Sequence, residues 1–223
     1  MMRSMNRSLV LISLLVITSC TSIDTTKIAP GYKETYVAIR NSIFGFPDSD
    51  ISPELIKNIP YASMLLNVGK GPKGLVILES ILADQYTWIS ADEIYLVIRN
   101  GKIIETRGFS NNLVDLIDRP LNFKEIISGN ISETKAFYSY DKPELKNLGI
   151  VLNYEVFAKE TIKILDQEKV LLKVEEKGEN RIIGWSFTNE YWVDEDFIVW
   201  KSKQHISPKI PHINYLVTKK PSK

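Results

Sequence analysis

The sequence predicts a mainly β protein: an antiparallel barrel-like or sandwich domain with a few short helices, preceded by a removable export signal. Roughly ten short runs rich in β-branched and aromatic residues are separated by turn signals every 8 to 12 residues or so. Two of these runs are joined by Asn100-Gly101, which is a strong hairpin signal. The 223-residue chain is 44% hydrophobic with four tryptophans, so it can build a substantial core.

The N-terminus has the features of an export signal. Arg3 and Arg7 precede an apolar run over residues 9–17 that Ser13 interrupts. A positive start, a short apolar stretch and small residues before a cleavage site are typical of a secretory signal. The run is about half as long as the roughly twenty residues that a transmembrane helix needs. We therefore expect residues 1–19 to be removed.

Cys20 is the one cysteine of the chain and directly follows Ile17, Thr18 and Ser19. This tetrapeptide resembles the lipobox, the motif that the lipoprotein signal peptidase recognises before it cuts in front of the cysteine. The resemblance implies a diacylglyceryl group and an N-acyl chain on Cys20, and more than one buried chain anchors a protein stably. The alternative is an ordinary secretory signal followed by a chance cysteine.

The lipid would hold the mature protein on a membrane without any spanning segment. Thr21 stands where an aspartate would resemble an inner-membrane retention signal, which favours the outer membrane, facing the periplasm. Residues 20–31 lack apolar periodicity and are expected to form a tether. We expect residues 32–223 to form a single β-rich domain.

The first elements expected after the tether are helical. Residues 32–44 carry apolar side chains at helical spacing. Ser52 suits an N-cap and Pro53 the first helical position, so a helical turn is expected over residues 52–56, ending by Pro60.

Strands follow over most of the remaining chain, with tight turns at Asp166-Gln167 and at residues 194–196. Residues 111–127 are expected to be helical or irregular, and residues 115–149 are a candidate crossover between two β halves. The expected strands cover residues 61–68, 74–82, 87–89, 94–99, 102–106, 137–140, 151–163, 165–175, 182–193, 197–204 and 212–218.

The charge balance argues against nucleic acid as a partner. The chain has 28 basic and 27 acidic residues, and removal of Arg3 and Arg7 shifts its net charge from +1 to −1. Binding to nucleic acid needs a concentrated basic face, which no part of the sequence supplies.

Neither a metal site nor a catalytic constellation is expected. His205 and His212 are the only histidines, and a zinc site normally needs three or four ligands. The sequence has no Gly-x-Ser-x-Gly nucleophile motif. The acids at 194–196 fit a turn, and Glu175-Glu176 fits a strand end better than a glycosidase acid pair.

Two groups of residues are candidates for binding. The tryptophans lie in expected strands, where a core position is the ordinary role and glycan contact the alternative; alternation puts Trp192 on the face opposite Tyr191. Pro208 and Pro211 suggest a sheet edge, a bulge or a strand crossing. With Gln204 and Trp192 they make the candidate interaction surface, because an exposed edge can accept a partner's strand.

Several fragments in this order resemble the GfcB/YjbF family (YmcC-like) of capsule and exopolysaccharide lipoproteins. Two departures are Lys102, where the family commonly has arginine, and Glu195-Asp196-Phe197, where the family's turn usually has a glycine. The fragments are Pro60-Tyr61-Ala62-Ser63-Met64, Trp88, Asn100-Gly101-Lys102, Thr106-Arg107-Gly108, Asn112-Leu113, Tyr191-Trp192-Val193-Asp194, Gln204, Pro208 and Pro211.

The resemblance implies a periplasm-facing, barrel-like domain that works with surface-polysaccharide genes. We expect an outer-membrane lipoprotein that assists capsule or exopolysaccharide assembly or export, without catalysis or cofactor, by docking an export protein. The alternatives are a carrier that holds a lipid or glycan in its barrel and, from a third class, a glycan-modifying enzyme that uses a carboxylate pair.

Overall fold

A computed structural model describes residues 51–221 of the chain. The expectations for residues 1–31 and for a helix over residues 32–44 lie outside these residues. The elements, in chain order, are α3 (Pro53–Asn58), β1 (Ser63–Val68), β2 (Gly74–Leu82), β3 (Gln85–Ser90), β4 (Tyr95–Arg99), β5 (Lys102–Arg107), β6 (Leu113–Asp118), α4 (Phe123–Ile127), β7 (Glu133–Asp141), β8 (Glu144–Ile164), β9 (Gln167–Asn180), β10 (Trp185–Val193), β11 (Val199–Gln204) and β12 (Ile213–Lys219).

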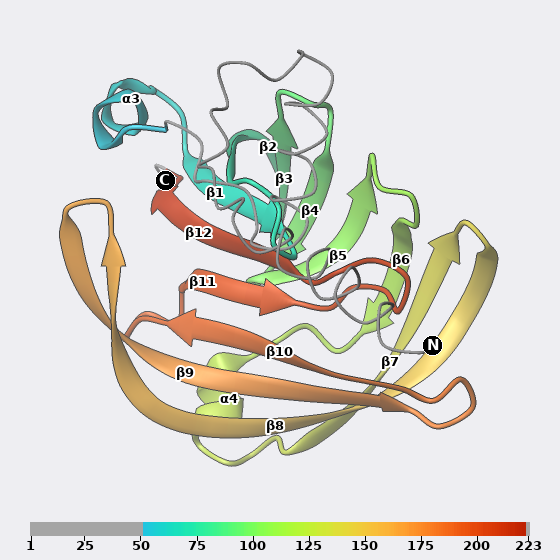
Figure 1. Cartoon of the computed structure of the whole chain (residues 1–223). Coiled ribbons are helices and arrows are strands. Elements are labelled where there is room, and N and C mark those ends of the chain that lie inside the picture. The colour runs from blue at the N-terminus through green and yellow to red at the C-terminus, as the bar shows by residue number, and fades with distance from the viewer. Residues whose placement is uncertain (1–50, 222–223) are drawn as a thin grey trace, which may run out of the picture. The chain divides into compact units, whose positions relative to one another are not determined.

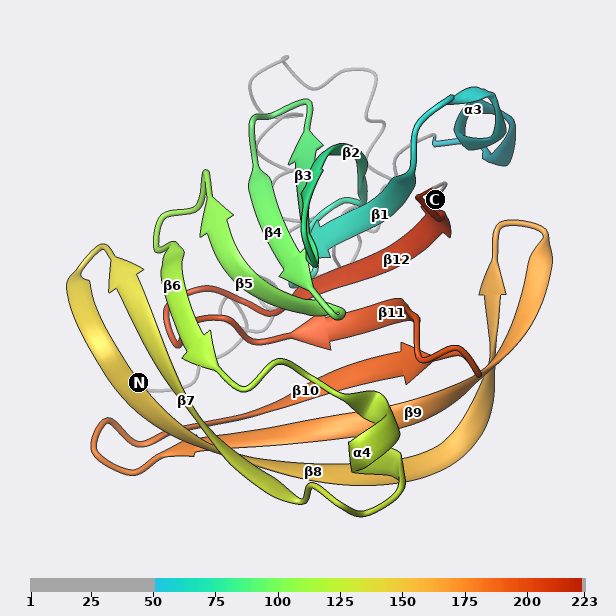
Figure 2. The same cartoon turned by 180° about the vertical axis from the view of Figure 1, so that it is seen from behind.

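All twelve strands belong to one antiparallel sheet, which decides between the expected barrel and sandwich. Their order is β5-β4-β3-β2-β1-β12-β11-β10-β9-β8-β7-β6, so two meanders are joined by the pairing of the first strand with the last. The sheet curls until its end strands, β5 and β6, lie side by side, although no ladder connects them (Figures 1 and 2). The result is a nearly closed barrel.

Local sequence signals account for several elements. Ser52 is the N-cap of α3, where its hydroxyl accepts a hydrogen bond from Leu55 N, and Pro53 begins the helix. Asn100 and Gly101 adopt φ angles of 49° and 81°, as the predicted two-residue hairpin requires. Both predictions are confirmed.

The middle of the chain differs from expectation. Residues 111–127 contain a strand, β6, before the short helix α4. The expected crossover over residues 115–149 is wrong, because β6, β7 and β8 pair in succession. The chain instead passes from one end of the sheet to the other through the short link between β5 and β6. The sequence of a short link does not show that the chain changes from one sheet edge to the other there.

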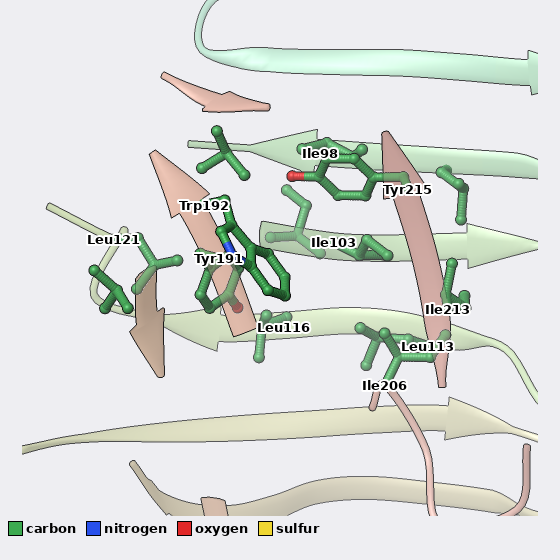
Figure 3. Close-up of a cluster of buried hydrophobic side chains, with 14 of the residues drawn as sticks. Ile98, Ile103, Leu113, Leu116, Leu121, Tyr191, Trp192, Ile206, Ile213 and Tyr215 are labelled. Carbon is green, nitrogen blue, oxygen red and sulfur yellow. The ribbon is translucent and has the colours of Figure 1, made fainter. Parts of the chain in front are cut away.

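The barrel core comes from one face of each strand. In β12 the buried residues alternate as Ile213, Tyr215 and Val217. In Figure 3, Ile213 and Tyr215 lie among core side chains from the two end strands of the sheet, such as Ile103 of β5 and Leu113 of β6. α4 adds its buried Phe123, whose ring lies edge-on to Tyr191 with centroids 5.6 Å apart.

The β8–β9 hairpin is the longest in the barrel. β8 has 21 residues, and its register with β9 shifts between Val156 and Lys159. Its end bends toward α3 and β12 (Figure 1), where Lys57 Nζ lies 2.6 Å from Asp166 Oδ2. The turn falls one residue before the predicted position, with Leu165 at φ 54°. Within residues 51–221, no helix has the length and apolar character needed to cross a bilayer.

Candidate functional site

Four charged side chains meet inside the barrel: Arg99 of β4, Lys102 of β5, Asp118 of β6 and Glu176 of β9. Lys102 Nζ lies 2.8 Å from Glu176 Oε2 and 3.4 Å from Asp118 Oδ2. Arg99 pairs with the other oxygen of Asp118. The side chains of Lys102, Asp118 and Glu176 are only 3, 2 and 0% exposed, so these three charges are shut off from solvent, whereas the Arg99 side chain is 17% exposed. It joins strands of both meanders.

Neutral groups complete the hydrogen bonding of Glu176. Asn189 Nδ2 donates to Glu176 Oε1 at 2.8 Å, and the Tyr191 hydroxyl donates to the same oxygen at 3.4 Å. Burial disfavours the ammonium form of Lys102, but the carboxylates of Glu176 and Asp118 outweigh it and raise the pKa of Lys102. Burial, with help from Glu176, raises the pKa of Tyr191 well above its ordinary value, so its phenol stays neutral.

The Asn100-Gly101 turn is held against β11 and β12 beside this cluster. Gln204 Nε2 donates to Gly101 O at 2.8 Å, and Gln204 Oε1 accepts from Ile103 N at 2.9 Å. The Tyr215 hydroxyl donates to Gly101 O at 2.6 Å. A Cβ at Gly101 would lie 2.2 Å from Val199 Cγ2, so the close approach requires glycine. The side chain of Gln204, on β11, thus forms hydrogen bonds with the β4–β5 turn and β5 on the side where β5 has no neighbouring strand in a ladder.

The link between β5 and β6 is fixed in the same way. Leu113 N donates to Thr106 Oγ1 at 3.0 Å, which ties the start of β6 to β5. Asn112 donates through its backbone and its side chain to Asp141, at 2.8 and 2.7 Å. We call Arg99, Gly101, Lys102, Asp118, Glu176 and Gln204 the closure network, because they connect the two meanders where no β ladder does.

The closure network is suited to holding the barrel shut rather than to chemistry. Its carboxylates are buried and already paired with cations, amides and a phenol. A glycosidase pair must instead reach a bound sugar and a water molecule. Several residues that carry the family resemblance therefore make contacts that hold the barrel together: Lys102, Thr106, Asn112 and Gln204.

The four residues of the candidate interaction surface do not form one exposed surface. Gln204 is 1% exposed inside the barrel, and Trp192 is 5% exposed. Pro208 and Pro211 are exposed, but they lie in the connection between neighbouring strands β11 and β12. The edge-strand interpretation is wrong because β11 and β12 both have partners on each side. Cys20, with Ile17, Thr18 and Ser19, lies outside the described residues.

The candidate acids take structural positions. Asp194 accepts hydrogen bonds from Asp196 N, Ile198 N and Trp200 Nε1, as a turn residue does. Burial works against the Asp194 carboxylate, but these bonds and Lys220 lower its pKa overall. The prediction that Glu175-Glu176 lies at a strand end is wrong. β9 continues to Asn180, so Glu176 is buried in the middle of the strand.

Trp192 and Tyr191 do point in opposite directions, as predicted. Trp192 Nε1 donates to Glu160 Oε2 at 2.7 Å, and the ammonium of Lys201 lies 4.0 Å from the Trp192 ring centroid. Tyr191 instead contacts Glu176 inside the barrel. His205 and His212, which the sequence analysis considered as metal ligands, have ring centroids 5.3 Å apart.

In the described part of the chain, the histidine pair has no further metal ligands beside it. Burial lowers the pKa of both His205 and His212, and the Nδ1 of His205 is buried without a hydrogen-bond partner. Among residues 51–221, no group of three or more histidine, cysteine or acidic side chains is placed to hold a metal ion.

Sequence reasoning did not predict that Glu176, Asp118 and Arg99 belong to a buried ion cluster, although the sequence carries one signal for the burial of Glu176. In β9 the exposed row would be Lys173, Glu175, Lys177 and Glu179, whereas Glu176 shares its parity with Val174, Gly178 and Asn180. A charge on the apolar face of a strand indicates a buried partner of opposite sign. Its partner Lys102 is 74 residues away, and no local pattern connects them.

A nearly closed antiparallel barrel with a buried, fully partnered ion cluster defines the class of this protein as a small β-barrel module. Residues 36–216 match the model of the family described as group 4 capsule polysaccharide lipoprotein GfcB, YjbF. The chain belongs to this family, and the resemblance found in the sequence is confirmed.

Individual relatives agree with this assignment. The chain is 24% identical over 179 residues to the uncharacterized lipoprotein YjbF of Escherichia coli (strain K12), covering 78% of this chain and 82% of the relative. It is 23% identical over 158 residues to the uncharacterized lipoprotein GfcB of the same strain, covering 70% and 74%. The crystal structure of the hypothetical lipoprotein YmcC from Escherichia coli (K12) has a TM-score of 0.64 at 20% identity, covering 83% of this chain and 96% of that one, which shows the shared fold.

Proposed function

We propose that this protein is a lipid-anchored component of the cell envelope that assists the assembly or export of a surface polysaccharide without catalysing a reaction. Its family is a family of capsule polysaccharide lipoproteins. The lipid on Cys20 would hold the barrel at the outer membrane, facing the periplasm, and the outer surface of the barrel would dock an export protein.

The observation that carries this proposal is the filled barrel interior. Large side chains such as Tyr138, Tyr191, Met64 and Leu152 are 0 to 2% exposed, and the ion cluster occupies the space among them. The carrier alternative needs an interior cavity, and the enzyme alternative needs accessible acids. Both requirements conflict with these packed and partnered side chains.

The outer face of β6 and β7 is the surface that best suits docking. Ile117 and Phe137 are paired across these strands and remain 56 and 42% exposed, and Val114, nearer the start of β6, is 45% exposed. Adjacent apolar side chains on a solvent-exposed face of a protein are characteristic of interaction sites. They also lie at the end of the sheet order, where β6 has no ladder partner on one side.

The anchor and the pathway are tested together in cells of the source organism. Deletion of the gene and the Cys20→Ala substitution should each reduce the exported polysaccharide, measured as cell-surface and released sugar. Mass spectrometry of the mature protein should show the acylated cysteine at its N-terminus. Unchanged polysaccharide in both strains would reject the proposal.

The docking face is tested by replacing apolar side chains that do not support the core. Ile117→Ser with Phe137→Ser should reduce export while the amount and thermal stability of the protein stay unchanged. Ile182→Ser is the matched control, because Ile182 is 92% exposed in the β9–β10 turn. Equal export by both variants would remove β6 and β7 as the docking face.

A further inference from the structure

The connection between β11 and β12 is partly buried in one end of the barrel. Ile206 and Ser207 are each only 2% exposed, and Figure 3 shows Ile206 among the core side chains. The Tyr140 hydroxyl donates to Ile206 O at 3.0 Å, and the Ser207 hydroxyl donates to Asn111 Oδ1. Residues 205–212, which we call the end strap, are therefore held against β7 and the β5–β6 link.

A histidine stands at each end of the end strap, and the two rings meet. The ring centroids of His205 and His212 are 5.3 Å apart, and the His205 ring also lies 6.3 Å from the ring of Phe187 on β10. His205 N donates to Asn189 Oδ1 at 2.7 Å, and His212 O accepts from Gly69 N at 2.8 Å. The ring pair thus connects the points at which the strap leaves β11 and reaches β12.

The charged side chains that face the histidine pair are Lys203 of β11 and Glu190 of β10. β1 contacts the pair through the uncharged Gly69. Glu190 is already paired with two lysines, because its carboxylate oxygens lie 2.5 Å from Lys173 Nζ and 3.5 Å from Lys203 Nζ. It therefore offers little attraction to an imidazolium ion, whereas Lys203 repels one.

The closed strap favours neutral histidines. The Nδ1 atom of His205 is buried and has no hydrogen-bond partner among the described residues, so a proton there would have no acceptor. Burial lowers the pKa of both rings, His212 adds to this effect at His205, and Lys203 acts on both. At His205 these effects outweigh the Thr188 carbonyl and Glu190, which favour the proton. Both rings are therefore mainly neutral at pH 7.

The sign of the pH dependence follows from the direction of these shifts. A histidine whose pKa is lowered in the closed form stabilises that form above its ordinary value of 6.5. This contribution is lost as the pH falls below 6.5 toward the lowered pKa, since the open form then binds more protons.

We propose that His205 and His212 form an acid-sensitive clasp, which holds the end strap in the barrel at neutral pH and releases it in mild acid. Two imidazolium ions would lie side by side at the ends of the strap and repel each other as well as Lys203. The open strap would expose Ile206 and free the amide of Asn111. The clasp is a property of the barrel itself and does not depend on the proposed export role.

The test measures amide hydrogen exchange in the full mature lipoprotein in detergent, at about pH 7.5 and about pH 5.5, on either side of the ordinary histidine pKa. Rates are corrected for the intrinsic effect of pH on exchange. We expect the amides of the end strap to exchange at least about tenfold faster at the lower pH, because protonation shifts the strap toward its open form. β12, which is paired on both sides, should keep its protection.

Two variants test the cause of the release. His205→Phe with His212→Phe keeps two rings that cannot gain a charge, so its strap should exchange equally at both pH values. Lys203→Gln keeps both histidines and removes a repelling charge, so its acid response should be smaller. Lys201→Gln, with the same change of charge on the same strand, is the matched control and should respond as the unmodified protein does.

Three outcomes would overturn the inference. The first is an equal exchange rate of the strap at both pH values in the unmodified protein. The second is an unchanged acid response in the double histidine variant or, if that variant does not fold, equal responses of Lys203→Gln and Lys201→Gln. The third is equal acceleration of the strap and β12, which would show that acid unfolds the barrel as a whole.

Discussion

At the residue scale, the interior of the barrel depends on a few polar side chains rather than on apolar packing alone. Lys102 and Glu176 are buried, 74 residues apart in sequence, and they bridge strands of different meanders. A buried ion pair adds little net stability when it is complete, because desolvation opposes attraction. Removal of only one of the two charges is costly, because the other charge stays buried without a partner.

The first prediction follows from this asymmetry. Lys102→Met should lower the free energy of unfolding by about 3 to 5 kcal/mol, measured by urea denaturation at pH 7, because Glu176 keeps its burial and loses its cation. Lys177→Met is the control: its pair with Glu155 is about half exposed on both sides, so its loss should leave the free energy of unfolding almost unchanged. Similar losses in the two variants would contradict this view of the ion cluster.

The second prediction separates backbone conformation from close approach at glycine. Gly101 and Gly129 have similar φ angles of 81° and 75°, but a Cβ would lie 2.2 Å from Val199 only at Gly101. Gly129→Ala should cost about 1 kcal/mol for the left-handed conformation. Gly101→Ala should cost about 1 to 3 kcal/mol more, because Val199 must move. Thermal or urea unfolding of both variants measures the difference, and equal losses would count against the tight packing of the turn.

At the scale of elements, tight connections fix the register of the barrel, and polar side chains hold them. Asp194 links the end of β10 to the start of β11 and also contacts Lys220, just past β12. Its carboxylate has a lowered pKa in the folded protein, so this contribution to stability is present above the unfolded value of 3.8. It is lost as the pH falls from there through the folded pKa.

The third prediction uses this pH dependence. Asp194→Asn should lower the free energy of unfolding by about 1 to 3 kcal/mol at pH 7, because hydrogen bonds to a charged acceptor are replaced by weaker ones. The difference from the unmodified protein should shrink below about pH 4, as its Asp194 becomes protonated. Asp196→Asn, in the exposed part of the same turn, should have little effect. Denaturation curves at several pH values would show a constant difference if the argument were wrong.

At the scale of the whole molecule, the two meanders depend on one another. The first and last strands pair, so neither meander has a complete sheet without the other. Where β5 meets β6, the closure network and the Thr106–Leu113 hydrogen bond replace the missing ladder. The inner faces of both meanders share one core.

The fourth prediction is that the described barrel unfolds as a single cooperative unit. Trp88 is the one tryptophan of the first meander, whereas the other three lie in β10 and β11. In a Trp88→Phe variant, tryptophan fluorescence therefore follows the second meander, and far-UV circular dichroism follows both. The two urea transitions should coincide. Separate midpoints would show that the meanders unfold independently.

The sequence by itself determined the local elements and the family. Alternation, the Asn100-Gly101 turn and the Ser52-Pro53 start are properties of neighbouring residues, so local patterns are sufficient to predict them. The long stretch around β6 was misread because its two short elements carry weak patterns. Removal of the signal and lipidation of Cys20 rest on the sequence alone and stay predictions.

Only the tertiary structure decided what those elements build. Which strands become neighbours, that the sheet closes as a barrel, and that Gln204 points inward all depend on contacts between residues far apart in the chain. The rings of His205 and His212 likewise meet only because the end strap turns back between β11 and β12. The physical reason is that side-chain periodicity specifies which face of a strand is buried, while the partner across the core is chosen by the packing of the whole barrel.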